Sequence, residues 1–365
     1  MDDARDYGAR GGSKPAAMAV ALLAFAFVLL GLCQGDGAAR SRSDQGVATA
    51  GFLQGVNMPW YNWRCDFGCR ADGGVTSTAE TLAPRFAALQ AAGVRHVRWW
   101  LFEGEAWQIA RDAAGVPTQV QPSVYQDLDA AIELGRRYEL AFTFVLFSAP
   151  SALPSAWLKE PRAREPLALA LRPLFQRYAH TPEVFAWEVF NEPEWEMWNG
   201  TVEPAAVQAT VRAIASEVRR SGPTHVTVGS AALDGLRFWT DAGLTFYEAH
   251  WYDEMGDGER CALCTDYAAV RARYNLDGPL VIGEFYAGRD VDSLARYEAF
   301  LAKGYSGAWG WSLWPERTDD GLAVDLAAAA EFATRHPVVK APGVRCLALA
   351  SGVRPASWGT ARGCR

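Results

Sequence analysis

Two glutamates stand where the sequence leaves strongly apolar stretches. Glu192 lies in "NEP", directly after the apolar run "VFAWEVF" at 184–190. Glu284 ends the apolar run "LVIGE" at 280–284. Strand interiors rarely contain Asn, Glu or Pro. Polar residues directly after an apolar run therefore mark either the point where the chain leaves the sheet or a functional site. Each carboxylate alone is equally well explained by helix capping or by pairing with an arginine. Together they suit a reaction that needs one group for acid–base work and another as nucleophile or base.

Other polar groups lie near the ends of neighbouring apolar runs. Arg98 lies within "VRWW", and a buried arginine needs a carboxylate partner, for which Glu284 is the candidate. That pairing would keep a nucleophile ionised. The segment "HWY" offers His250 and Tyr252 on one face; the hydroxyl could hold the nucleophile, and the imidazole could position the acid or contact sugar hydroxyls.

Aromatic residues are abundant, with 15 Trp in 365 residues. Some must be core residues, but exposed flat faces suit sugar rings, bases or quaternary ammonium ions. Trp311 in "GWSLW" could form the floor of a subsite, with Trp314 as the alternative, and Asn191 could bond a sugar hydroxyl. The segment "GVNMPWYNW" places Trp60 in a loop that either faces substrate or packs.

The elements that must position these groups alternate along the chain. Short apolar runs, each followed by a helix-like stretch, are expected as strands at 51–57, 94–102, 140–148, 183–191, 225–230, 245–252, 279–285 and 306–314. Helices are expected at 77–93, 125–138, 167–179, 204–222, 233–240, 265–274, 291–303 and 323–335. Eight such units predict an α/β fold, a (β/α)8 TIM barrel. The rival is an open doubly wound sheet, but no Gly-x-Gly-x-x-Gly follows the first strand.

In such a barrel, chemistry lies at the carboxyl ends of the strands. Strands four and seven are expected to face each other across the ring, so that both carboxylates reach the mouth. Side chains alternate along a strand, which predicts one face for Glu188, Phe190 and Glu192, with Glu188 pointing inward beneath Glu192.

Composition excludes several classes of function. The net charge is −7, and the basic residues are scattered. The sequence therefore has no basic patch of the kind that binds nucleic acid. Only five His are present, so a His-rich metal centre is disfavoured. No metal or other cofactor is expected.

The N-terminal residues have the features of a targeting segment. Residues 15–35 are uncharged, and small residues before Arg40 suit cleavage, so 1–39 is expected as a signal peptide or, alternatively, a membrane anchor. Cys33 raises the further alternative of lipidation. The catalytic barrel is expected over 40–336, followed by a tail at 337–365. The chain is therefore expected to be secreted or periplasmic, or else anchored and facing outside, with membrane contact only through that anchor.

Six cysteines remain after Cys33, an even number that fits disulfides in an exported chain. The near-neighbour pairs 65–69, 261–264 and 346–364 are the preferred set among fifteen connectivities. A four-thiolate zinc site is the rival.

The ordered set of "NEP" after strand four, "GEF" at strand seven, arginine on strand two, "HWY" at strand six and tryptophan at strand eight resembles the clan A retaining glycoside hydrolases. It is most similar to family five, the cellulase and mannanase-like group. The resemblance implies Glu192 as acid/base and Glu284 as nucleophile, with Asn191, Arg98, His250, Tyr252 and Trp311 in supporting positions. One departure is that strand three ends in "FSAPSALPSAW" without His, which leaves the substrate class open.

The expected activity is hydrolysis of O-glycosidic bonds in a β-linked oligo- or polysaccharide by double displacement. The two carboxyl groups should then lie about 5–5.5 Å apart. Glu192 is expected to have a raised pKa and Glu284 a low one. The alternatives are a non-catalytic carbohydrate-binding barrel and a metal-dependent barrel hydrolase.

Overall fold

The computed structural model describes residues 51–69, 73–104 and 106–339 of the chain. The expected signal segment and lipidation site, the third cysteine pair and nearly all of the expected tail lie outside these residues. Within the described residues, no helix is both long and apolar enough to cross a bilayer.

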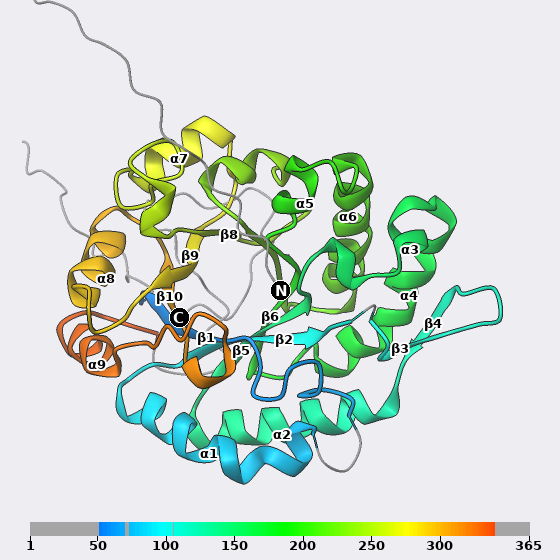
Figure 1. Cartoon of the computed structure of the whole chain (residues 1–365), viewed down its shortest axis with the longest axis horizontal. Coiled ribbons are helices and arrows are strands. Elements are labelled where there is room, and N and C mark those ends of the chain that lie inside the picture. Colours follow the sequence, from blue (N-terminus) through cyan, green and yellow to red (C-terminus); the bar gives the residue numbers. More distant parts are fainter. Residues whose placement is uncertain (1–50, 70–72, 105, 340–365) are drawn as a thin grey trace, which may run out of the picture. The chain divides into compact units, whose positions relative to one another are not determined.

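Eight parallel strands close into a barrel, and helices surround it (Figure 1). The barrel strands are β1 (Leu53–Met58), β2 (His96–Phe102), β5 (Ala141–Phe147), β6 (Val184–Asn191), β7 (His225–Ser230), β8 (Tyr247–His250), β9 (Leu280–Tyr286) and β10 (Gly307–Trp311). The ring order is β1-β10-β9-β8-β7-β6-β5-β2. The predicted TIM barrel is confirmed, and each predicted strand is present to within a few residues.

The outer helices follow the strands in turn. They are α1 (Val75–Ala91), α2 (Pro122–Tyr138), α4 (Pro161–Tyr178), α6 (Pro204–Ser221), α7 (Tyr267–Tyr274), α8 (Ser293–Ala302) and α9 (Leu326–Arg335). In α6, the buried residues Val207, Val211, Ile214 and Val218 recur at helical spacing and face the barrel. Pro204 fits the first turn because its missing N–H has no intrahelical partner there.

The short helix predicted near 233–240 is present as the 3-10 helix η2 (Leu233–Phe238). Its residues Leu233 and Leu236 are buried, so the segment still covers the barrel. A run this short can bury its apolar residues without the regular period of an α-helix.

Short elements at the connections were not predicted. They are β3 (Ile109–Arg111), β4 (Pro117–Val120), α3 (Ser155–Lys159), α5 (Glu194–Trp198), η1 (Pro150–Ala152), η3 (Asp253–Met255) and η4 (Pro315–Arg317). Strands β3 and β4 form an antiparallel hairpin that lies beside α4 (Figure 1). All of these follow barrel strands, so they surround the carboxyl end of the barrel.

The barrel interior is layered. An apolar layer holds Phe185, Phe246, Val281 and Trp309, which are all buried and lie just before their strands or no further along them than the middle. Charged side chains follow above it, toward the carboxyl ends. The charged layer therefore lies between this apolar layer and the carboxyl ends of the strands.

Two disulfides fall within the described residues. Cys65 pairs with Cys69 in the loop after β1, and Cys261 pairs with Cys264 before α7. Both are pairs that the spacing predicts, so the four-thiolate zinc alternative is wrong.

Candidate active site

The carboxyl end of the barrel brings the two predicted glutamates together. Glu192 follows the last residue of β6, and Glu284 lies near the end of β9. A carboxylate oxygen of each lies within 4.8 Å of the other. The prediction that their strands face each other is wrong, because only β7 and β8 separate them in the ring. The shorter path along the ring helps to explain their closeness.

The backbone bends at Glu192. The register of β6 against β7 shifts between Glu188 and Asn191, and Glu192 has a φ of +44°. Glu188 and Asn191 both contact the same guanidinium, so the regular alternation predicted from Glu188 to Glu192 breaks before the strand ends. A positive φ is uncommon for a residue with a side chain and concentrates at functional positions.

Arg98 is completely buried at the centre of the site. Its Nη1 donates to Glu284 Oε1 at 2.5 Å, which is the pair predicted from the sequence. Its Nη2 donates to Asn191 Oδ1 at 2.7 Å. The guanidinium also lies over the ring of Trp100, 4.3 Å from the ring centroid. Arg98 is therefore fixed from several sides and holds one oxygen of Glu284.

Asn57 on β1 was missed by the sequence analysis. Its Oδ1 accepts from Arg98 Nη1 at 3.0 Å, while its Nδ2 donates to the carbonyl of Gly283 at 2.9 Å. Asn57 and Arg98 are paired in register on neighbouring strands. The available signal was an amide inside the apolar strand at 51–57.

Two further carboxylates lie beneath the glutamates. Glu188, as predicted, points inward, and both of its oxygens accept from Arg98 at 2.6 Å. Glu248 on β8, which was missed, has an oxygen 3.0 Å from Arg98 Nε. Burial raises the pKa of Glu188 to about 8, although the charge of Arg98 opposes this rise.

Two glycines make room for these buried carboxylates. A Cβ on Gly229 of β7 would come within 2.3 Å of Glu188 Oε1, and one on Gly283 of β9 within 2.0 Å of Glu248 Oε1. Heavy atoms cannot approach so closely, and both carboxylates are fully enclosed. The layer therefore requires glycine at both positions.

His250 and Tyr252 lie on the same side, as predicted. His250 Nδ1 lies 2.7 Å from Glu192 Oε1, and the Tyr252 hydroxyl donates to Glu284 Oε2 at 2.9 Å. His250 and Glu284 are register partners on β8 and β9, so the sheet itself sets this arrangement. Each glutamate thus has its own partner from the "HWY" segment.

The pKa shifts reverse the order expected from the sequence. Burial would raise the pKa of Glu192, but its contacts with His250 and Trp195 hold it below its ordinary value. Burial would lower the pKa of His250, but the surrounding carboxylates, led by Glu284, raise it to about 10. At neutral pH the proton between Glu192 and His250 therefore lies on the imidazole.

Burial also raises the pKa of Glu284, although the charges of His250 and Arg98 oppose this. Both of its oxygens accept hydrogen bonds, one from Arg98 and one from Tyr252. Burial raises the pKa of Tyr252 well above its ordinary value, so its hydroxyl keeps its proton and remains a donor. A carboxyl group with a donor on each oxygen favours the ionised form.

The predicted tryptophans occupy different surroundings. Trp311 at the end of β10 is partly buried; its Nε1 donates to Asp320 at 2.7 Å, and its ring meets Trp100 edge-on. Trp60 is also partly buried, and its Nε1 donates to the carbonyl of Arg317. Trp314 is buried against Tyr61, with Arg85 over its ring, which favours a packing role.

Trp195 is a residue that the sequence analysis missed. It lies on α5, and its Nε1 donates to Glu192 Oε2 at 3.0 Å. Glu192 is thus held on both oxygens, by His250 on one and by Trp195 on the other. The signal was its place three residues after Glu192.

Strand three, β5, ends without a histidine, as the sequence shows. In its place, the Ser148 hydroxyl donates to Glu103 Oε2 at 2.8 Å, just beyond the end of β2. Burial raises the pKa of Glu103 to about 7.

Glu192, His250 and Glu284 are close enough together to ligate a metal ion. However, Arg98 already binds one oxygen of Glu284, and His250 carries a proton on the side of the glutamates. Two positive charges thus occupy the space in which a metal cation would be stabilised.

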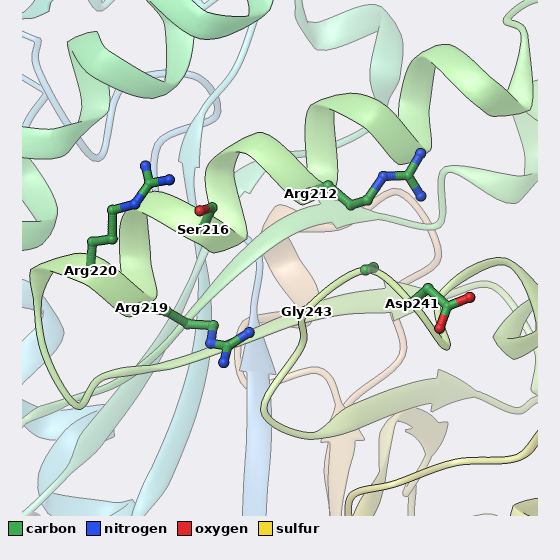
Figure 2. Close-up of a pocket in the computed structure, with 7 residues that line it drawn as sticks. Arg212, Ser216, Arg219, Arg220, Asp241 and Gly243 are labelled. Atoms are coloured by element: carbon green, nitrogen blue, oxygen red, sulfur yellow. The ribbon is translucent and has the colours of Figure 1, made fainter. Parts of the chain in front are cut away.

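Away from the glutamates, a hollow of about 460 Å³ lies on α6 and the loop before β8 (Figure 2). Arg212, Arg219 and Arg220 line it together with Asp241. Because α6 ends just before β7 begins, the last turn of α6 lies at the amino end of the strands, away from the glutamates. The three arginines are exposed to solvent, and Arg220 pairs with Glu217, so we assign no function to this hollow.

Comparison with known proteins gives the class of activity. The chain is 27% identical over 320 residues to a mannan endo-1,4-beta-mannosidase from Mytilus edulis, covering 73% of this chain and 84% of that protein. It is 24% identical over 312 residues to an enzyme of the same name from Cryptopygus antarcticus, covering 71% and 80%. The solved structure of the blue mussel beta-mannanase matches with a TM-score of 0.63 at 21% identity, covering 77% of this chain and 90% of that one.

This chain is a glycosidase. It resembles the family-five glycoside hydrolases, as its motifs predict. No protein-family model matches the sequence. The glycosidase assignment favours a catalytic role over the non-catalytic binding barrel considered above.

Proposed function

We propose that the chain is an endo-acting β-1,4-mannanase in which Glu192 is the acid/base and Glu284 the nucleophile. The observation that carries the proposal is the pair of carboxylates within 4.8 Å of one another at the open end of a TIM barrel. This separation suits a retaining enzyme, because an inverting one needs about 6.5–9.5 Å between the carboxyl groups to admit a water. The mannan substrate rests on the two relatives named above.

In the first step, Glu284 attacks the anomeric carbon of the sugar bound on its side. The proton that His250 carries passes through its short hydrogen bond to Glu192 and from Glu192 to the leaving oxygen, which leaves Glu192 ionised and His250 neutral. The bond between the anomeric carbon and the leaving oxygen breaks, and an ester to Glu284 forms. Arg98 and Tyr252 hold the carboxylate of Glu284 in place during the attack.

In the second step, a water molecule takes the place of the leaving sugar. Glu192, now ionised, accepts a proton from this water and passes it back to His250, while the oxygen of the water attacks the anomeric carbon. The ester bond to Glu284 breaks, and the sugar is released with its configuration retained.

We also propose that the chain works outside the cytoplasm. The two disulfides within the described residues lie in loops at the catalytic end of the barrel, and disulfides persist in oxidising compartments.

The test is hydrolysis of a glycan panel by the fragment that starts at residue 40. The panel holds linear mannan, galactomannan, cellulose, xylan and mannohexaose. We expect internal cleavage of the mannans. NMR should show that the new anomeric centre keeps the configuration of the substrate. Glu284→Gln should abolish activity, and Glu133→Gln, on the exposed side of α2, is the matched control. Activity confined to another glycan would contradict the substrate, and unchanged activity of Glu284→Gln would contradict the mechanism.

A further inference from the structure

Trp195 is a large apolar side chain that is exposed to solvent beside Glu192. Among the described residues, three large apolar side chains are exposed, and Trp195 is one of them, with 45% of its surface accessible. Its indole nitrogen is bonded to Glu192, so the exposed ring lies beside the acid/base. An exposed aromatic face next to reacting groups is suited to stacking on a ligand.

The ring is held in place by its neighbours. Trp198 meets Trp195 edge-to-face, with centroids 5.2 Å apart and planes at 86°. The guanidinium of Arg260 lies over Trp198 at 4.5 Å, and Arg260 in turn pairs with Asp234 of η2. Trp195 is thus backed by groups from two other connections.

The helix that carries the ring is anchored from below. Glu194 of α5 is fully buried, and its Oε1 accepts from Ser230 at 2.7 Å and from Trp239 at 2.6 Å. Its Oε2 accepts from the backbone of Ala231 at 2.9 Å. These bonds join α5 to the end of β7 and to η2, so the exposed ring stands on a fixed support.

The position of the ring relative to the glutamates decides which sugar it meets. The nucleophile must touch the anomeric carbon, and the acid must touch the leaving oxygen. Trp195 contacts Glu192, while Tyr252 and Arg98 contact Glu284. The exposed ring therefore lies on the leaving-group side of the scissile bond.

We propose that Trp195, backed by Trp198, is the stacking platform for the leaving sugar and for the acceptor sugar in glycosyl transfer. This inference rests on the proposed roles of Glu192 and Glu284. The ligand class is a β-linked pyranose with a flat C–H face. In transfer, an acceptor hydroxyl attacks the anomeric carbon of the glycosyl ester, the bond to Glu284 breaks, and Glu192 accepts the hydroxyl proton.

The test compares two substrates that differ only in the leaving group. Mannotetraose has a sugar on the leaving side, whereas β-mannobiosyl fluoride has a single atom that cannot stack. Trp195→Ala should lower kcat/KM for mannotetraose about tenfold more than for the fluoride. Trp195→Phe keeps an aromatic face but loses the N–H bond to Glu192, so it should recover most of this difference. Leu169→Ala, at an exposed position on the outer helix α4, is the control.

Transfer provides a second measurement. With the fluoride as donor and mannobiose as acceptor, Trp195→Ala should lower the ratio of transfer to hydrolysis about tenfold, measured by mass spectrometry. An equal loss of kcat/KM on both substrates, with an unchanged ratio of transfer to hydrolysis, would contradict the stacking role. Trp195 would then act only through Glu192. A wild-type enzyme that is inert toward both substrates would overturn the proposed function itself and the platform with it.

Discussion

His250 Nδ1 lies 2.7 Å from Glu192 Oε1 and 3.6 Å from Glu284 Oε2, so one buried imidazole faces both glutamates. Its raised pKa, about 10, makes it a cation at neutral pH. A cation between two carboxylates reduces their mutual repulsion and lets them lie close together. His250 therefore supplies both a proton and the charge balance of the site.

The pH dependence of activity follows from these groups. Because burial raises the pKa of Glu284, activity should fall on the acid side as this carboxylate takes up a proton. It should fall on the alkaline side as His250 loses its proton toward pH 10. His250→Gln should lower kcat/KM at least about tenfold. It should also change the pH at which kcat/KM falls on the alkaline side of the profile, here called the alkaline limb. A kcat/KM profile of both proteins checks this, and an identical alkaline limb in the variant would contradict it.

The same histidine links stability to pH. Its folded pKa, about 10, is above its ordinary value of 6.5, so the folded state binds this proton more tightly. The resulting stabilisation is complete below about pH 6.5 and is lost as pH rises through about 10. Urea unfolding at pH 6 and pH 10 should show a larger loss of stability for the wild type than for His250→Gln. Equal losses would show that His250 is not charged in the folded state.

The hydrogen bond from Tyr252 to Glu284 provides a separate test. A hydrogen bond to a charged group is worth about 1.5–3 kcal/mol, so Tyr252→Phe should lower kcat/KM about 10- to 100-fold. Losing this donor should also raise the pKa of Glu284 further and shift the acid limb to higher pH. Tyr274→Phe is a matched control, because its hydroxyl is bonded to Glu259 on the outer surface. An unshifted acid limb in Tyr252→Phe would contradict this role.

Removal of divalent metal ions should leave activity unchanged. The cations Arg98 and His250 already balance the charge at the glutamates, and the proposed steps use only carboxylates and protons. Activity on mannohexaose after dialysis against excess EDTA should equal that before treatment. A loss that a divalent ion restores would favour the metal-dependent alternative.

The sequence predicted the fold and much of the site because both rest on strand-end patterns. Glu192 and Glu284 each follow an apolar run, His250 lies near the end of a predicted strand, and the carboxyl ends of parallel strands meet at one end of a barrel. Asn57 and Glu248 were missed because a polar residue inside a strand does not reveal which face it occupies until the register is known. The pKa order was wrong because it depends on the distance from His250 to each glutamate, which no sequence spacing gives.

The space left by Gly229 should be essential to the site. An added Cβ would come within 2.3 Å of Glu188 Oε1 and 2.7 Å of Arg98 Nη2, and both side chains are fully buried. Arg98 cannot move away without breaking the bonds that hold Glu284 and Asn191, and Glu188 cannot move away without breaking its own bonds to Arg98. Gly229→Ala should therefore cost about 1–3 kcal/mol of stability and lower kcat at least about tenfold.

Gly258→Ala is the matched control for this substitution, because an added Cβ there meets nothing within 4 Å. It should leave both the melting temperature and kcat unchanged. Thermal unfolding and initial rates on mannohexaose measure the two effects. A Gly229→Ala variant with wild-type kcat would show that the Arg98–Glu188 pair does not position the nucleophile. A variant that loses stability but keeps kcat would confine the role of this pair to folding.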